Sequence, residues 1–134
     1  VEFSEQNLVD CDTRSGGCDG GDARNGFRYV QENGGIDTEA SYPYDGVKET
    51  CHFDRSSVGE TDDGYIDVPE GDEELLKNVL AKVGPLSVAI YCSESFQAYR
   101  GGVYYEPNCK DDHLHLNHNV LLVGYGTDEK LGDY

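Results

Sequence analysis

Basic residues are scarce in this sequence. Its 134 residues contain 10 Lys and Arg against 27 Asp and Glu, which gives a formal net charge of -17 at pH 7 and a pI of about 4.3. A chain this acidic repels phosphate groups, so neither nucleic acids nor anionic membranes are expected partners. The surface carboxylates would repel one another less in an acidic compartment, where part of them are protonated.

The sequence also lacks an apolar run long enough to span a membrane, internal repeats, low-complexity tracts and any Cys-x-x-Cys pair. Without such a pair, the five cysteines favour disulfides over a structural zinc site. Their odd number requires either a free thiol or a partner outside the sequence. Neither Val1-Glu2-Phe3 nor Gly132-Asp133-Tyr134 is typical of a natural terminus, so we interpret the sequence as a fragment.

Capping residues and apolar spacing predict three helices. The first begins after Ser4, its N-cap, and ends near Cys11; the others cover residues 23–33 and 73–83. Glycines follow the second and third helices, where a left-handed residue commonly ends a helix.

The second half of the sequence favours strands. Runs of β-branched and aromatic residues predict strands over residues 86–91, 102–105 and 119–125. With helices early and antiparallel strands late, the predicted fold class is α+β. A domain boundary near Gly64 divides the chain into residues 1–64 and 65–134.

His118 stands at the entry to the last of these strands, which we interpret as buried. A histidine held on a rigid strand and partly shielded from water titrates near neutrality, so it can move a proton for a nucleophile. The alternative is a core histidine bonded to a backbone carbonyl, and the residue alone does not decide between the two.

Several motifs, which occur in the same order in one known protein family, favour the catalytic role of His118 over the core histidine. They are Ser4-Glu5-Gln6-Asn7-Leu8-Val9-Asp10-Cys11, Gly17-Cys18-Asp19-Gly20-Gly21, Ser41-Tyr42-Pro43-Tyr44, Gly84-Pro85-Leu86-Ser87-Val88-Ala89-Ile90, Asn117-His118-Asn119-Val120 and Gly124-Tyr125-Gly126. Together they resemble the papain family of cysteine proteases, above all its cathepsin L branch, from end to end of the sequence. The resemblance implies a papain-like α+β fold truncated at both ends, with the end of the helical left domain at 1–64 and most of the β-rich right domain at 65–134.

The resemblance also implies a mechanism. In this family a cysteine thiolate attacks the peptide carbonyl, a histidine pairs with the thiolate and protonates the leaving amine, and an asparagine orients the imidazole. His118 matches the histidine, whereas the nucleophile would precede Val1 and the asparagine would follow Tyr134. Papain-type histidines follow the nucleophile by roughly 130–150 residues, which is more than the sequence before His118 provides. We therefore expect the parent protein to be a cysteine endopeptidase without a cofactor, and the isolated sequence to be inactive.

Substrate-binding residues follow by similarity. Gly20 and Gly21 match the pair that lets an extended substrate approach the backbone closely. Five residues match positions that line the neighbouring S2 and S3 pockets: Asp22, Ala23, Ala89, Leu116 and Asn119. Asn117 matches a residue whose carbonyl contacts the substrate backbone. Asp22 stands where cathepsin L has a bulky apolar residue, and it predicts tolerance for basic groups near S3.

The family pattern pairs Cys11 with Cys51 and leaves Cys18 and Cys109 with partners outside the sequence. Cys92 matches no family cysteine, and we interpret it as a buried or free thiol. The resemblance further implies a monomer that acts on peptides or proteins, is controlled by a propeptide or cystatin-like inhibitors, and is lysosomal or secreted, including into a digestive lumen.

Two other functions stay open on the sequence. One is an inactive papain-like homologue that binds peptides beside Gly21. The other is a metal site, because His113 and His115 would share one face of a strand, although His118 breaks that register. Solvated loop histidines explain the same residues more simply, so no metal is expected.

Overall fold

The computed structural model describes all residues 1–134, which form two compact units, Val1–Asp67 and Val68–Tyr134. Along the chain the division falls after Asp67, three residues beyond the boundary expected near Gly64. None of the helices has the length and apolar character that crossing a membrane requires.

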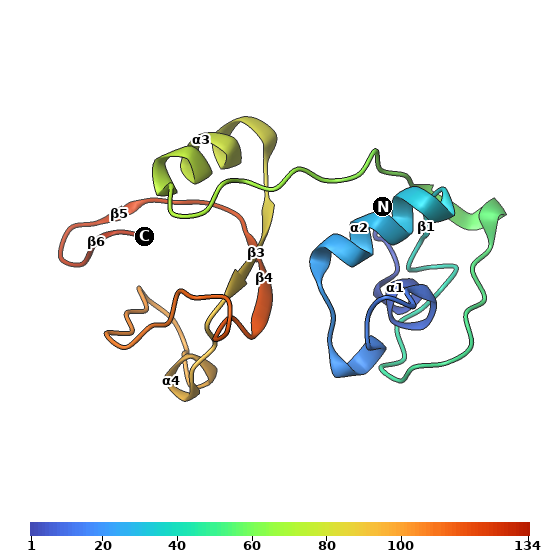
Figure 1. The fold of residues 1–134 in the computed structure, drawn as a ribbon, viewed down its shortest axis with the longest axis horizontal. Coiled ribbons are helices and arrows are strands. Elements are labelled where there is room, and N and C mark those ends of the chain that lie inside the picture. Colours follow the sequence, from blue (N-terminus) through green and yellow to red (C-terminus); the bar gives the residue numbers. More distant parts are fainter. The chain divides into compact units, whose positions relative to one another are not determined.

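The first unit contains two α-helices and a small antiparallel sheet (Figure 1). Its elements are α1 (Glu5–Cys11), η1 (Gly17–Asp19), α2 (Ala23–Asn33), β1 (Ile36–Asp37), η2 (Arg55–Ser57) and β2 (Val58–Glu60). Ser4 accepts a hydrogen bond from the Asn7 N–H and so caps α1, as predicted. The left-handed Gly34 ends α2 at the predicted residue, with φ of 79°.

The apolar core of this unit is small, and polar side chains fill much of its interior. Cys11, Tyr29, Val30 and Tyr42 form the apolar cluster. The buried polar side chains are Ser4, Gln6, Asn7, Asp10, Asp12 and Asp37. Because a buried polar group without a partner costs free energy, this interior must satisfy its donors and acceptors internally.

Asp10 is the centre of that network. Its carboxylate accepts hydrogen bonds from Gln6 Nε2 at 2.9 Å, from the Glu49 N–H at 2.7 Å and from the Tyr42 hydroxyl at 2.7 Å. Burial alone would raise the pKa of Asp10, but these three bonds and the nearby His52 lower it below its ordinary value. Burial and the same carboxylate raise the pKa of Tyr42 to about 12. Asp10 therefore links α1 to two segments about 30 to 40 residues away in the sequence.

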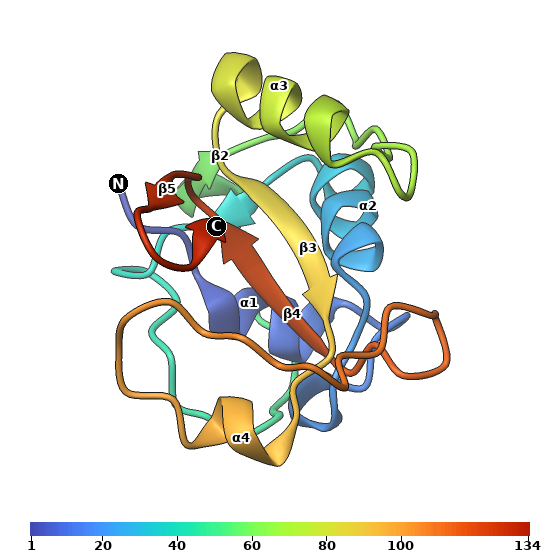
Figure 2. The same ribbon diagram turned by 90° about the vertical axis from the view of Figure 1, so that its left-hand side faces the viewer.

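The second unit contains two separate antiparallel strand pairs. Its elements are α3 (Glu73–Val83), β3 (Leu86–Ile90), α4 (Glu94–Gln97), β4 (His118–Leu122), β5 (Thr127–Asp128) and β6 (Gly132–Asp133). α3 has the predicted bounds because Asp72 accepts a hydrogen bond from the Leu75 N–H at its start and Gly84 follows its end. β3 and β4 run side by side in opposite directions (Figure 2), from the Leu86–Leu122 pair to the Ile90–His118 pair.

Two strand predictions need correction. The strand expected over residues 102–105 is absent, since Gly101 and Gly102 have φ of 155° and 85° and the Tyr99 hydroxyl folds back to donate to the Gly102 carbonyl. The strand expected over residues 119–125 is shorter because its partner β3 begins at Leu86, opposite Leu122. The expectation that β4 is buried is also wrong, as His118, Asn119 and Leu121 are exposed in this chain.

We predict that Asp10→Ala lowers the free energy of unfolding of the intact protein by about 2–3 kcal/mol at neutral pH, because two buried donors and the partly buried Glu49 N–H lose a charged acceptor. The lowered pKa sets the pH dependence of this stabilisation. It is present above the ordinary aspartate pKa of 3.8 and is lost as the pH falls through the lower folded-state value. Denaturant titrations of both proteins between pH 3 and 7 measure the difference.

Glu49→Gln is the matched control, because it removes a nearby charge but keeps the N–H that Asp10 accepts. An Asp10→Ala protein as stable as the wild type at pH 7 would contradict the role of this carboxylate.

Candidate active site

His118 is the first residue of β4 and is paired with Ile90 at the last residue of β3. The strand pair therefore fixes where its backbone lies. The neighbouring pair Ala89–Asn119 lies on the opposite face, because successive residues of a strand alternate. Two of the predicted substrate-binding residues thus lie directly opposite each other, with both side chains exposed.

Asn117 strengthens this end of the strand pair with its side chain. Its Oδ1 accepts a hydrogen bond from the Cys92 N–H at 2.7 Å, and its Nδ2 donates to the Cys92 carbonyl at 3.2 Å. Its own N–H donates to the Ile90 carbonyl at 3.1 Å. The amide therefore continues the ladder beyond its last backbone pair. The sequence resemblance gave Asn117 only a backbone role, so this side-chain function was missed.

The loop between α1 and α2 carries the predicted glycine pair. The Gly20 carbonyl accepts from the Gly16 N–H at 2.7 Å, and Gly20 itself has φ of 105°, a conformation that side chains disfavour. A Cβ on Gly21 would lie 2.6 Å from Ser15 Oγ. Each glycine is therefore required locally, the first by its backbone conformation and the second by its close neighbour.

Asp22 and Ala23 follow this pair at the start of α2. Asp22 caps the helix by accepting from the Arg24 N–H at 2.8 Å, and it also forms an ion pair with the Arg24 guanidinium. Hydrogen bonds from that guanidinium lower the pKa of Asp22. Arg24 was not singled out in the sequence, although its position two residues after an acidic N-cap could have indicated the pair.

The cysteines fall into two groups. Cys11 and Cys51, which the resemblance pairs, form a disulfide with a Cα–Cα distance of 4.9 Å. Cys18, Cys92 and Cys109 are thiols, of which Cys18 and Cys109 are exposed and Cys92 is half-buried. The Cys18 Sγ lies 3.5 Å from the Gly46 carbonyl oxygen.

The histidines considered for a metal site do not lie on a strand. His113 and His115 occupy a turn, so the premise that they share a strand face is wrong. His113 pairs with Glu70 at 2.9 Å, whereas His115 pairs with Asp112 at 2.8 Å and lowers its pKa. The two rings thus engage different carboxylates.

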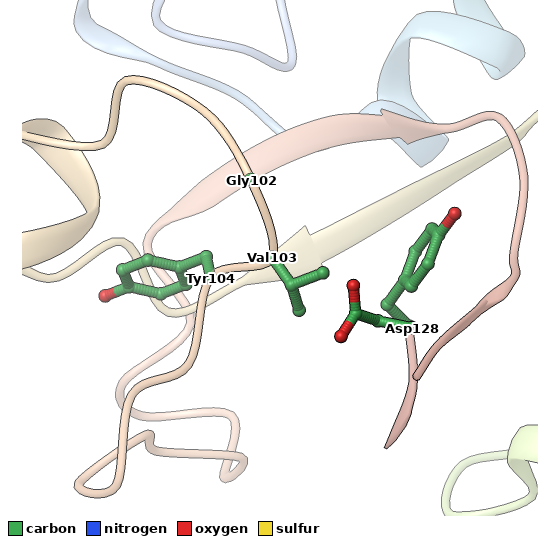
Figure 3. A pocket seen from close by; sticks show the side chains of 5 residues that line it. Gly102, Val103, Tyr104 and Asp128 are labelled. Carbon is green, nitrogen blue, oxygen red and sulfur yellow. The ribbon is translucent and has the colours of Figure 1, made fainter. Parts of the chain in front are cut away.

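A pocket of about 430 Å³ lies elsewhere in the second unit. It is lined by Gly102, Val103, Tyr104, Asp128 and Tyr134. Figure 3 shows the Val103 and Asp128 side chains pointing toward each other, while the ring of Tyr104 points away from them. The pocket includes none of the predicted site residues.

Comparison with known proteins now identifies the class to which this arrangement belongs. The family model described as papain family cysteine protease matches residues 1–134, and the chain belongs to this family.

Individual relatives agree with that assignment. The chain is 58% identical to a cathepsin L of Sarcophaga peregrina and 56% identical to cathepsin L1 of Drosophila melanogaster, matched over 100% of the chain and over 40% and 36% of those proteins. The solved structure of digestive procathepsin L2 from the Tenebrio molitor larval midgut matches with a TM-score of 0.92 and 41% identity, over 96% of this chain and 40% of that one. The chain therefore spans about 40% of the length of these relatives, and the fold expected from the sequence is confirmed as papain-like α+β.

We predict that Asn117→Ala speeds hydrogen exchange of the Cys92 amide by about fivefold in the intact protein, because that N–H loses its acceptor. The loss corresponds to one hydrogen bond, about 1 kcal/mol. Exchange measured by mass spectrometry or NMR tests it, with Asn108→Ala as a control at an exposed asparagine of the same unit. Unchanged protection of Cys92 would show that the amide does not hold this end of the ladder.

Proposed function

We propose that the protein containing these residues is a cysteine endopeptidase of the cathepsin L type. It hydrolyses peptide bonds through a thiolate–imidazolium pair in which His118 is the histidine. His118 takes the proton of the thiol and later gives it to the leaving amine, while the nucleophilic cysteine and the orienting asparagine lie outside residues 1–134. The observation that carries this proposal is the family match over residues 1–134. His118, which matches the family histidine by resemblance, is the first residue of β4.

The fixed backbone of His118 supports this role. A proton shuttle must keep its geometry while charge develops on the substrate, and preorganised elements achieve this better than loops. The backbone pair with Ile90 and the Asn117 amide both hold the end of β4. Exposure of His118 in this chain leaves the ring accessible to a partner group.

Substrates are peptides or proteins in this proposal. The backbone at Gly20 and Gly21 binds them in an extended form, since the missing Cβ atoms permit close approach. By resemblance to the family, we assign Asp22, Ala23, Ala89, Leu116 and Asn119 to the flanking substrate subsites, and the Asn117 carbonyl to contact with the substrate backbone. The two units correspond to parts of the left and right domains of the papain fold.

Regulation and location follow the relatives. The similar solved structures include digestive procathepsins, so a propeptide partner and a lysosomal or secreted location are proposed for this protein as well. Its excess of acidic residues suits an acidic compartment.

We expect His118→Ala to reduce kcat/KM of the intact protein for a peptide substrate by about 10³-fold or more, because both proton transfers lose their carrier. Steady-state hydrolysis of a fluorogenic peptide measures the loss. His115→Ala, three residues earlier, removes an exposed ring that bonds Asp112 and should change kcat/KM by less than about twofold. Equal activity of the His118 variant and the wild type would exclude the proposed mechanism.

We also expect Gly21→Ala to lower kcat/KM by about tenfold or more, because the new methyl group obstructs the substrate backbone. The same methyl group would contact Ser15, so the double variant Ser15→Gly with Gly21→Ala is needed. That variant removes the internal contact and keeps the obstruction, and it should stay as impaired as Gly21→Ala. Recovery of wild-type kcat/KM in the double variant would assign the defect to folding of the loop instead.

A further inference from the structure

Asp22 is placed both beside the glycine pair and at the start of a helix. It directly follows Gly21, and it is the N-cap of α2. Its carboxylate is held by Arg24 through the backbone N–H and through the guanidinium, with Nε 3.0 Å from Oδ1 and Nη2 2.6 Å from Oδ2. The side chains are 43% and 56% exposed, so the pair stands at the protein surface. The negative charge of Asp22, next to Gly21, is therefore paired with Arg24, two residues further along the chain.

The surroundings reinforce this pairing. Arg28, one turn further along α2, also lowers the pKa of Asp22 through its positive charge, and the negative charge of Asp67 adds to that of Asp22 in raising the pKa of Arg24. The Arg28 guanidinium bonds the Tyr65 hydroxyl at 2.7 Å and lies over its ring, which keeps it from replacing Arg24 as a direct partner. Arg24 thus makes the direct ion pair that neutralises Asp22.

We infer that Arg24 is a specificity-determining residue, which masks the Asp22 carboxylate and so keeps the adjoining substrate subsite nearly neutral. This inference rests on the proposed function, since it concerns the substrate side chain that lies beside Gly21 and Asp22, the P3 side chain. It differs from the sequence expectation, in which Asp22 alone favours basic groups. With the ion pair intact, basic, apolar and acidic side chains are accepted with similar efficiency; without Arg24, the subsite is acidic and favours Lys.

The test compares three fluorogenic peptides that differ only in carrying Lys, Leu or Glu at P3, hydrolysed by the intact protein at low ionic strength. The quantity measured is the ratio of kcat/KM for the Lys peptide to that for the Glu peptide. A ratio is independent of the fraction of protein that folds, so it reports the subsite even if a variant is less stable.

We expect Arg24→Gln to raise this ratio by about three- to tenfold, as one unpaired exposed charge does at contact distance. The increase should largely disappear at 1 M NaCl, where screening shortens the range of such a charge. Asp22→Asn leaves Arg24 unpaired but still caps the helix, so it should move the ratio in the opposite direction. The double variant should return close to the wild-type ratio.

Arg55→Gln is the matched control. It removes the same charge at the other end of α2, where Arg55 donates to the Asn33 carbonyl, and it should leave the ratio unchanged. Hydrolysis of all three peptides with an unchanged ratio in Arg24→Gln would overturn the inference and leave the proposed function intact. Absence of hydrolysis by the wild type would overturn the proposed function and this inference with it.

Discussion

The first unit of this chain depends on the pairing of buried polar groups. Its interior contains more buried polar side chains than apolar ones, and the apolar cluster is limited to Cys11, Tyr29, Val30 and Tyr42. Such an interior is stable only if nearly every donor meets an acceptor. Gln6 illustrates the requirement, because its amide donates to Asp10 and to the Val47 carbonyl and accepts from two further N–H groups. Removing one partner leaves others unsatisfied, which makes the network cooperative.

This network also positions the loop that carries the glycine pair. Asn7 bonds Cys11 Sγ and the Tyr29 hydroxyl, and it accepts the Asp37 N–H, so α1 is tied to α2 and to β1. The disulfide to Cys51 adds a covalent link at the last residue of α1. The loop that follows thus begins and ends on fixed helices, and Gly20 and Gly21 are held between them. In the second unit the β3–β4 pair and the Asn117 side-chain amide hold the backbone of His118 in place in the same way.

The sequence predicts the three longest helices and the strand β3 closely, but it does not predict α4, β1 or β2. The bounds of α2 and α3 depend on local caps, Asp22 with Gly34 and Asp72 with Gly84, which can be read directly from the chain. The short strands β1 and β2 have no alternating pattern and form only because distant segments meet. Residues 102–105 have the β-branched and aromatic composition of a strand, yet they do not pair with any other strand.

In the candidate site, too, some features could be predicted from the sequence and others could not. The family motifs predicted which residues to consider, including His118 and the glycine pair. They did not predict the Asp22–Arg24 ion pair or the amide of Asn117, because neither is part of a motif. The polar network around Asp10 was missed as well, since its partners lie about 30 to 40 residues away in the sequence. Side-chain partners of this kind depend on tertiary structure.

The central claim is that His118 serves a nucleophilic cysteine located outside residues 1–134. The most direct measurement is the intact mass of the natural protein after treatment with a thiol-directed epoxide, followed by mapping of the labelled peptide. We expect a mass well above 14.8 kDa, a single label, and a labelled cysteine that is none of the five in this sequence. Absence of a label, or a label on Cys18, Cys92 or Cys109, would contradict the claim.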